Sequence, residues 1–301
     1  MEQGKGKAVT IYYAFCPPKA GLPGEYLEYQ RKLADRILRH GFQNSLGIEF
    51  DRGRVAKGEK GKPYWAGEEG IVFNVSNTDG LVACGVSAGG TKEKGCAGDA
   101  LGSAVGFAEG KRAGGLAEDR HGWDGAALSQ KGNGSGKQPE SGGETACFAV
   151  GVDAEKPRKV RMPLLRKCCS PEEIGYILGI RPSSINGSHG RGPLDAEKSG
   201  KQEGLSYCSK DTMELKEGSW ERFSQIWTLK ESYIKMTGEG LSFPLEEVNF
   251  RIGGQGKGGC NIWCSQPAYF SQKQIGEYWV SVCTRERAEI VWEELPIAIL
   301  Q

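Results

Sequence analysis

The chain has 301 residues, a net charge of +1, 38% hydrophobic residues and 46 glycines. So balanced a charge gives no overall sign of a nucleic-acid partner, and no apolar run has the length of a membrane span. The N-terminus lacks the pattern of a secretory signal, so we expect a cytoplasmic protein. Low hydrophobic content with abundant glycine predicts ordinary folded parts separated by glycine-rich insertions.

The first half of the chain alternates strand and helix patterns. Residues 9–16 (VTIYYAFC) are rich in β-branched and aromatic residues and predict a strand. Residues 25–42 carry spaced apolar residues and predict an amphipathic helix that ends at Gly41. Residues 71–77 and 81–87 predict two strands joined by the turn TDG.

The second half repeats this coarse pattern, and two polar insertions are predicted, at 88–145 in the first half and at 181–218 in the second. Residues 145–153 predict a strand, Ser170 is a good helix N-cap before Pro171, and residues 219–238 predict the strongest helix, ending at Gly238. Four further strands are expected at 248–253, 261–266, 278–284 and 289–295.

Strands that pair locally with a few helices predict an α+β fold. We expect two similar α+β halves related by pseudo-two-fold symmetry, residues 1–150 and 151–301, and a monomer because both halves lie in one chain.

Ten cysteines are scattered along the chain without any CxxC pair, which disfavours a zinc site. Several lie in apolar runs, including Cys84, Cys147 and Cys283, and are expected to be buried thiols in a reducing compartment.

The segment WTLKESYIK places Trp227, Glu231 and Lys235 four residues apart, on one stripe of the predicted helix. One interpretation is an ordinary surface ion pair. The other is a site in which a carboxylate binds a metal and an ammonium binds a phosphate.

Other polar residues favour the second interpretation. Asp153 and Glu155 leave an apolar strand on the same side, where two unpaired carboxylates would be costly. A hard cation such as Mg²⁺ would offset that cost, particularly with phosphate ligands. Each residue also has a simpler interpretation: a solvated strand end for these two, a turn lysine for Lys62, and a local backbone contact for Ser76.

The order GKPYW, FNVSN, VGVDAE and FSQIWTLKESYIKMTGEGLSFPL resembles the Sfp-type 4'-phosphopantetheinyl transferases. That family carries a G-[IV]-D-x-E strand end followed by a [FW]-[ST]-x-K-E-[SA]-x-x-K helix. The resemblance extends from Tyr26 to Cys283, apart from the two insertions. It implies transfer of phosphopantetheine from coenzyme A to a serine of an acyl or peptidyl carrier protein, with release of adenosine 3',5'-bisphosphate. The pathway would be fatty acid, polyketide or nonribosomal peptide synthesis.

The resemblance also implies roles for individual residues. Asp153, Glu155 and Glu231 would bind Mg²⁺, with Glu231 the base, acting through a water molecule. The residues implied to contact coenzyme A are Arg31, Lys32, Lys62, Ser76, Asn77, Lys230 and Lys235, with Lys235 directed at the reacting pyrophosphate.

One departure concerns Asn77, which stands where the family usually has histidine and cannot carry a positive charge. It leaves open the alternative of a catalytically decayed module that binds coenzyme A or a carrier protein.

Overall fold

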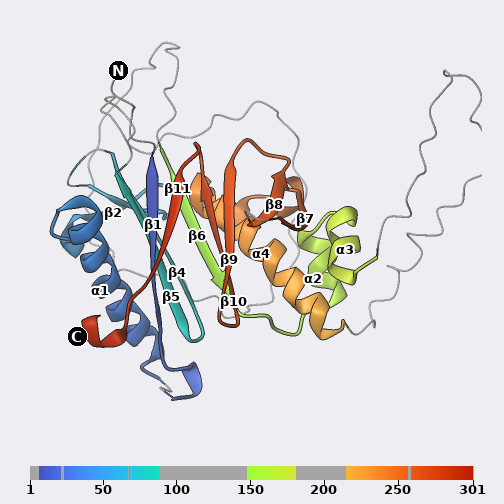
Figure 1. Ribbon diagram of the computed structural model, residues 1–301, viewed down its shortest axis with the longest axis horizontal. Coiled ribbons are helices and arrows are strands. Elements are labelled where there is room, and N and C mark those ends of the chain that lie inside the picture. The colour runs from blue at the N-terminus through green and yellow to red at the C-terminus, as the bar shows by residue number, and fades with distance from the viewer. Residues whose placement is uncertain are drawn as a thin grey trace, which may run out of the picture.

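The computed structural model describes residues 7–21, 24–66, 68, 70–88, 148–180, 215–256 and 259–300 (Figure 1). The insertions predicted at 88–145 and 181–218 lie almost wholly outside these residues. At their described edges, Ala88 still belongs to strand β5 and Glu217 already begins helix α4.

The larger sheet has four strands in the order β11 (Glu289–Glu294), β1 (Ala8–Phe15), β5 (Leu81–Ala88) and β4 (Ile71–Thr78). Strand β1 runs antiparallel to β5 and parallel to β11, with Ile11 opposite Gly85 and Trp292. The sheet therefore combines strands from both ends of the chain. The predicted β4–β5 hairpin is confirmed.

The second sheet has three antiparallel strands in the order β6 (Val150–Glu155), β10 (Tyr278–Thr284) and β9 (Tyr269–Ile275). Two short antiparallel ribbons accompany the sheets, β2 (Val55–Lys57) with β3 (Pro63–Trp65), and β7 (Phe250–Gly256) with β8 (Gly259–Cys264).

The α-helices are α1 (Tyr26–Leu46), α2 (Met162–Cys168), α3 (Pro171–Leu178) and α4 (Glu217–Thr237). In Figure 1, α1 lies to the left of the strands, α2 and α3 lie to the right, and α4 runs from behind the strands to the lower right. Short 3₁₀ helices occur at Lys19–Gly21, Arg52–Arg54, Gly240–Ser242, Leu245–Glu247 and Ile297–Leu300. None of the helices in the described parts is both long and apolar enough to cross a bilayer.

The α+β class is confirmed, and so are two predicted helix ends. Ser170 caps α3 in a capping box with Glu173, and Gly238 ends α4 at a φ of 78°. The predicted end of α1 at Gly41 is wrong. The helix continues to Leu46 and is capped by Gly47 at a φ of 68°. Gly41 lies inside the helix, where a Cβ atom would come 2.9 Å from the ring of Tyr12, so close packing accounts for this glycine.

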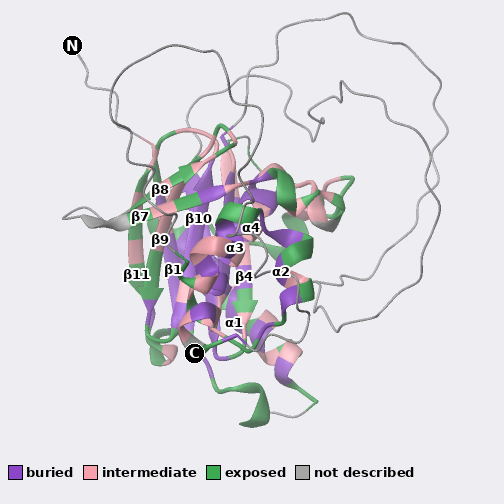
Figure 2. Ribbon diagram, turned by 90° about the vertical axis from the view of Figure 1, so that its right-hand side faces the viewer, coloured by how far each residue is buried: buried purple, intermediate pink, exposed green. Residues whose placement is uncertain are grey.

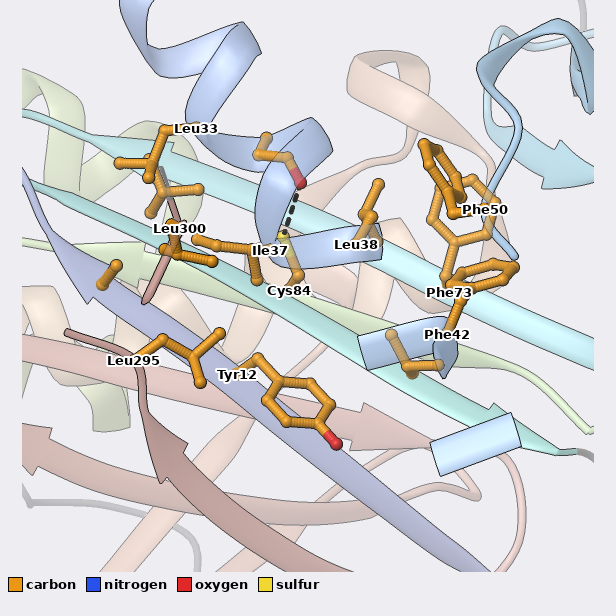
Figure 3. Packing of buried hydrophobic residues seen from close by; sticks show 14 of the residues in the cluster. Tyr12, Leu33, Ile37, Leu38, Phe42, Phe50, Phe73, Cys84, Leu295 and Leu300 are labelled. Atoms are coloured by element: carbon orange, nitrogen blue, oxygen red, sulfur yellow. Dashed lines mark hydrogen bonds between the residues drawn. The ribbon is translucent and has the colours of Figure 1, made fainter. Parts of the chain in front are cut away.

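Three groups of buried side chains hold these layers together. Figure 3 shows the first, in which Leu33, Ile37 and Leu38 of α1 pack towards the larger sheet. A second surrounds α4 and includes Ile226 and Leu229. A third lies between the faces of the two sheets, and its members are Val9, Ile11, Tyr13, Leu81, Ala83, Phe148, Val150, Val152, Ala154, Ile275, Tyr278, Val280 and Val282. In Figure 2 the central strands, such as β1 and β10, are largely coloured as buried, whereas β11 at the edge is exposed or half-buried.

The described cysteines agree with the expectation of free thiols. Cys84 and Cys283 are fully buried and neither is in a disulfide, whereas Cys147 lies outside the described residues. The predicted Mg²⁺ site depends on carboxylate oxygens and not on these thiols. The first of these carboxylates, Asp153, lies where β4, β6 and α4 meet.

Candidate active site

Helix α4 lies directly on strand β6 because Gly151 has no side chain. A Cβ atom at Gly151 would come 2.0 Å from the carbonyl oxygen of Ser232 and 2.4 Å from the backbone nitrogen of Met236. Any larger residue would separate the two elements. The glycine of the GVDAE segment thus brings the last turns of α4 onto the strand that carries Asp153 and Glu155.

This packing joins Lys235 to Asp153. The ammonium Nζ of Lys235 lies 2.7 Å from Oδ1 of Asp153 and 3.1 Å from the hydroxyl of Ser76. The Ser76 hydroxyl in turn donates to the same Oδ1 at 3.1 Å. Burial raises the pKa of Asp153, and the charge of Lys235 opposes that shift. The other oxygen, Oδ2, is buried without a hydrogen-bond partner among the described residues.

Glu155 lies two positions further along β6, on the same side of the strand. Burial and, secondly, the charge of Asp153 raise the pKa of Glu155 to about 7, while Arg158 and Lys235 act in the opposite direction. Thr78 donates its hydroxyl to Oε2 of Glu155 at 3.4 Å. The two carboxylates therefore share one buried environment in which a cation is favourable.

Strand β4 supplies a row of side chains to this site. Asn74 accepts the N–H of Val152 at 2.8 Å, and Ser76 accepts the N–H of Ala154 at 3.0 Å. Sequence reasoning missed Asn74 and Thr78. The signal was present, because positions 74, 76 and 78 of a strand lie on one face, but the strand's partner was unknown.

The donor set fits Mg²⁺ only in part. Among the described residues, no group of three or more His, Cys, Asp and Glu side chains could hold a metal ion. The predicted set of three carboxylates is therefore not assembled. Asp153 and Glu155 do come together, and the open Oδ2 of Asp153 fits an ion that takes its other ligands from phosphate and water, as Mg²⁺ commonly does. Glu231 lies one turn before Lys235 on α4. The hydrogen bond with Cys169 lowers the pKa of the Cys168 thiol, and the negative charge of Glu231 is one of the smaller influences that raise it.

Lys230 does not reach this site. It is fully buried, with Nζ 2.8 Å from Oε2 of Glu173, which is fully buried as well. The same ammonium donates to the carbonyls of Leu245 and Val248 at 2.8 and 2.6 Å. Three acceptors use all three N–H donors of a lysine. The environment of Lys230 therefore does not support its predicted contact with coenzyme A.

Lys62 lies at the end of α4, next to the site but without a described contact to its carboxylates. Its Nζ donates to the carbonyl of Met236 at 2.6 Å, and a Cβ atom at Gly238 would touch its side chain. Burial, and secondly the charge of Arg285, lower the pKa of Lys62 to about 8. The lysine thus connects the first half of the chain to the C-terminal end of α4, where exposed carbonyls favour a cation.

The remaining predicted residues lie around α1. Asn77 donates to Oε1 of Gln30 at 3.1 Å, and Gln30 donates to the carbonyl of Thr78 at 2.7 Å. Arg31 follows Gln30 on α1, and Lys32 forms an exposed pair with Glu28 at 2.7 Å. Gln30, which is 3% exposed, was another residue missed from the sequence.

Trp227 stacks on Phe223, with ring centroids 5.7 Å apart, and packs on the buried group around α4. Its place agrees with a packing role for the aromatic residue of the helix stripe.

Comparisons with known proteins identify the segment that carries this arrangement. No curated protein sequence matches the chain. A holo-(acyl-carrier-protein) synthase from Bacillus anthracis str. Ames, solved in complex with CoA, matches at 13% identity and a TM-score of 0.26, covering 45% of this chain and 93% of that one. An apo-ACPS structure from Chronobacterium ammoiniagenes matches at 13% identity and a TM-score of 0.23, covering 46% and 94%.

The family comparison is specific to the second half. The family model described as the 4'-phosphopantetheinyl transferase superfamily matches residues 149–283, which include β6, α4 and β10. The match to the 4'-phosphopantetheinyl transferase superfamily therefore covers the segment of the chain that contains Asp153, Glu155, Glu231 and Lys235.

Proposed function

We propose that this protein is an Sfp-type 4'-phosphopantetheinyl transferase that moves phosphopantetheine from coenzyme A to a serine of an acyl or peptidyl carrier protein. The observation that carries the proposal is the cluster of Asp153, Glu155 and Lys235 inside the family segment, with Oδ2 of Asp153 open. A buried carboxylate oxygen without a partner is costly, so it favours a ligand that supplies positive charge.

At phosphorus, the reaction breaks one P–O bond and forms another. The hydroxyl oxygen of the carrier serine bonds to the phosphorus that bears the pantetheine, and the bond from that phosphorus to the bridging oxygen breaks. Adenosine 3',5'-bisphosphate takes that oxygen, and the proton of the serine goes to a base. Catalysis therefore needs neutralised phosphate charge, in-line positioning and a proton acceptor.

The side chains of the site match these needs. Asp153 and Glu155 would hold Mg²⁺, which when bound would neutralise the pyrophosphate charge. The ammonium of Lys235 would stabilise the charge that develops on the transferred phosphate. Glu231, one turn away on α4, would accept the serine proton through a water molecule.

The coenzyme A contacts of the proposal come from the first half of the chain. The nucleotide and its phosphates would be surrounded by Lys62, which lies beside the C-terminal end of α4, by Asn77 on β4, and by Arg31 and Lys32 on α1. The N–H groups of the Asn77 amide donate hydrogen bonds but supply no charge, so we expect weaker coenzyme A binding than a histidine would give.

Intact-protein mass spectrometry tests the proposal. An apo carrier protein incubated with this chain, coenzyme A and Mg²⁺ should gain one phosphopantetheine. A chelator and the variant Glu231→Ala should each abolish the gain, whereas Glu293→Ala, which removes a surface carboxylate beside His40, should not. No gain with acyl, polyketide and peptidyl carriers would contradict the proposal.

The alternative is a decayed module that binds coenzyme A, and Asn77 is the residue that favours it. The variant Asp153→Ala separates the two functions. An enzyme should lose nearly all turnover, whereas a binding module should lose only affinity for coenzyme A.

A further inference from the structure

Strand β4 holds strand β6 through side chains rather than through a backbone ladder. Among the described strands, β4 and β6 belong to different sheets and are not paired. Three alternate side chains of β4 contact β6 instead. Asn74 accepts a backbone N–H of β6, Ser76 bonds both backbone and carboxylate, and Thr78 donates to a carboxylate.

The Ser76 hydroxyl has no capacity left for a substrate phosphate. A serine hydroxyl offers one donor and two acceptor lone pairs. The donor goes to Oδ1 of Asp153, and the lone pairs accept from the N–H of Ala154 and from Lys235. The side chain is also 2% exposed. A phosphate oxygen can only accept hydrogen bonds, so it would have to take the donor away from Asp153.

Asn74 and Thr78 extend the same contact in both directions along β6. Without the amide of Asn74, which is 4% exposed, the buried N–H of Val152 would lose its partner. Without the hydroxyl of Thr78, Glu155 would lose a donor directed at Oε2. The carbonyl of Thr78 is itself held by Gln30 of α1 at 2.7 Å.

We propose that Asn74, Ser76 and Thr78 are positioning residues, which fix the carboxylates of Asp153 and Glu155 in the orientation that binds a divalent cation. In this proposal Ser76 is not a coenzyme A ligand, contrary to the prediction from the sequence. The proposal rests on the proposed function, because it concerns the same metal site. Residues that orient metal ligands typically change metal affinity about 10- to 100-fold when replaced.

The test measures Mn²⁺ binding to the full chain by electron paramagnetic resonance, without coenzyme A. Ser76→Ala, Asn74→Leu and Thr78→Val should each weaken binding about tenfold or more, and Thr78→Ser should restore it. Ser87→Ala is the matched control, since Ser87 is a buried strand serine whose hydroxyl donates to the carbonyl of Ala8 and not to Asp153 or Glu155. It should bind Mn²⁺ like the wild type.

A second measurement follows the contact itself. Backbone amide exchange of Val152 should become faster in Asn74→Leu, and that of Ala154 in Ser76→Ala, with little change in Ser87→Ala. Adenosine 3',5'-bisphosphate binding in chelator should be the same in Ser76→Ala and the wild type. Loss of that binding, with unchanged Mn²⁺ affinity, would overturn the inference and restore Ser76 as a phosphate ligand.

The wild type distinguishes the two possible failures. If the wild type neither binds Mn²⁺ nor modifies a carrier, the proposed function fails, and the positioning proposal fails with it. If the wild type does both and the three variants bind Mn²⁺ normally, only the positioning proposal fails.

Discussion

The hydroxyl of Ser76 lies 3.1 Å from Oδ1 of Asp153, although the two residues are 77 positions apart in the chain. One residue belongs to the larger sheet and the other to the smaller sheet. Lys235, 82 positions beyond Asp153, completes the contact from α4. The candidate site therefore exists only when β4, β6 and α4 are packed together, and the first predictions concern that packing.

Gly151→Ala should be severely destabilising. The new methyl group would overlap the backbone of α4 at Ser232 and Met236, which no rotamer change can relieve. We expect the free energy of unfolding in urea to fall by about 3 kcal/mol or more, at the upper end of the overpacking range. Transfer activity should fall as well, because Lys235 would move away from Asp153.

Gly175→Ala is the control for that variant. Gly175 lies in α3, and a Cβ atom there has its nearest neighbour at 3.9 Å, an ordinary contact. Alanine is favoured over glycine in helices, so stability should stay the same or rise by up to about 1 kcal/mol. Equal stability of the two variants would contradict the close packing of α4 on β6.

The Lys230→Met variant should unfold more easily, with no direct effect on the binding of coenzyme A. The substitution leaves the buried carboxylate of Glu173 without its cation, which typically costs about 3–5 kcal/mol. The double variant Lys230→Met, Glu173→Gln should recover part of this loss, since glutamine keeps an acceptor for the N–H of Phe250. A double-mutant cycle by urea unfolding measures the coupling. A stable Lys230→Met with weaker coenzyme A binding would instead show that Lys230 contacts the substrate.

Lys62 should make stability depend on pH in the alkaline range. Its pKa is lowered from the ordinary 10.5 to about 8, so between these values the unfolded chain holds a proton that the folded chain has lost. Unfolding free energy should therefore rise with pH across this window, by at most about 3 kcal/mol. Below pH 8 the lysine is charged in both states, and the full cost of burying that charge remains.

Urea unfolding of wild type and Lys62→Met between pH 7 and 10.5 isolates this effect, because other groups titrate equally in both proteins. The unfolding free energy of the wild type, relative to that of Lys62→Met, should rise as pH rises. For Lys60→Met, at an exposed position of the same turn, the difference in unfolding free energy from the wild type should not change with pH. A constant difference for Lys62→Met as well would contradict the lowered pKa.

Asn77→His should lower the KM for coenzyme A. An imidazolium supplies a charged donor where the amide supplies a neutral one, a gain of about 1 kcal/mol or roughly fivefold in affinity. The effect should grow below pH 6.5, where histidine is mostly protonated. Asn44→His, at an exposed position of α1, is the control and should leave the KM unchanged. An unchanged or higher KM for Asn77→His would refute the prediction.

The sequence by itself determined those elements whose signals are local. The apolar runs of β1, β5 and β6, the cap at Ser170 and the long pattern of α4 all fix backbone geometry through neighbouring residues. Strand β9 and helix α2 were missed, because YFSQKQI is too polar for a strand pattern and MPLLRKC is too short to show a helical period.

Only the tertiary structure decided which charged side chains share a site. Lys230 and Lys235 belong to one motif and look equivalent in sequence, yet one pairs with Glu173 in the core and the other with Asp153. The partner of each lysine comes from a distant part of the chain. Which face of α4 meets that partner depends on how the helix packs on β6 at Gly151. Hydrogen bonds and ion pairs act over a few ångströms in space, irrespective of sequence separation. The motif therefore gave the chemical types of the side chains, and the packing of the two sheets and α4 decided their partners.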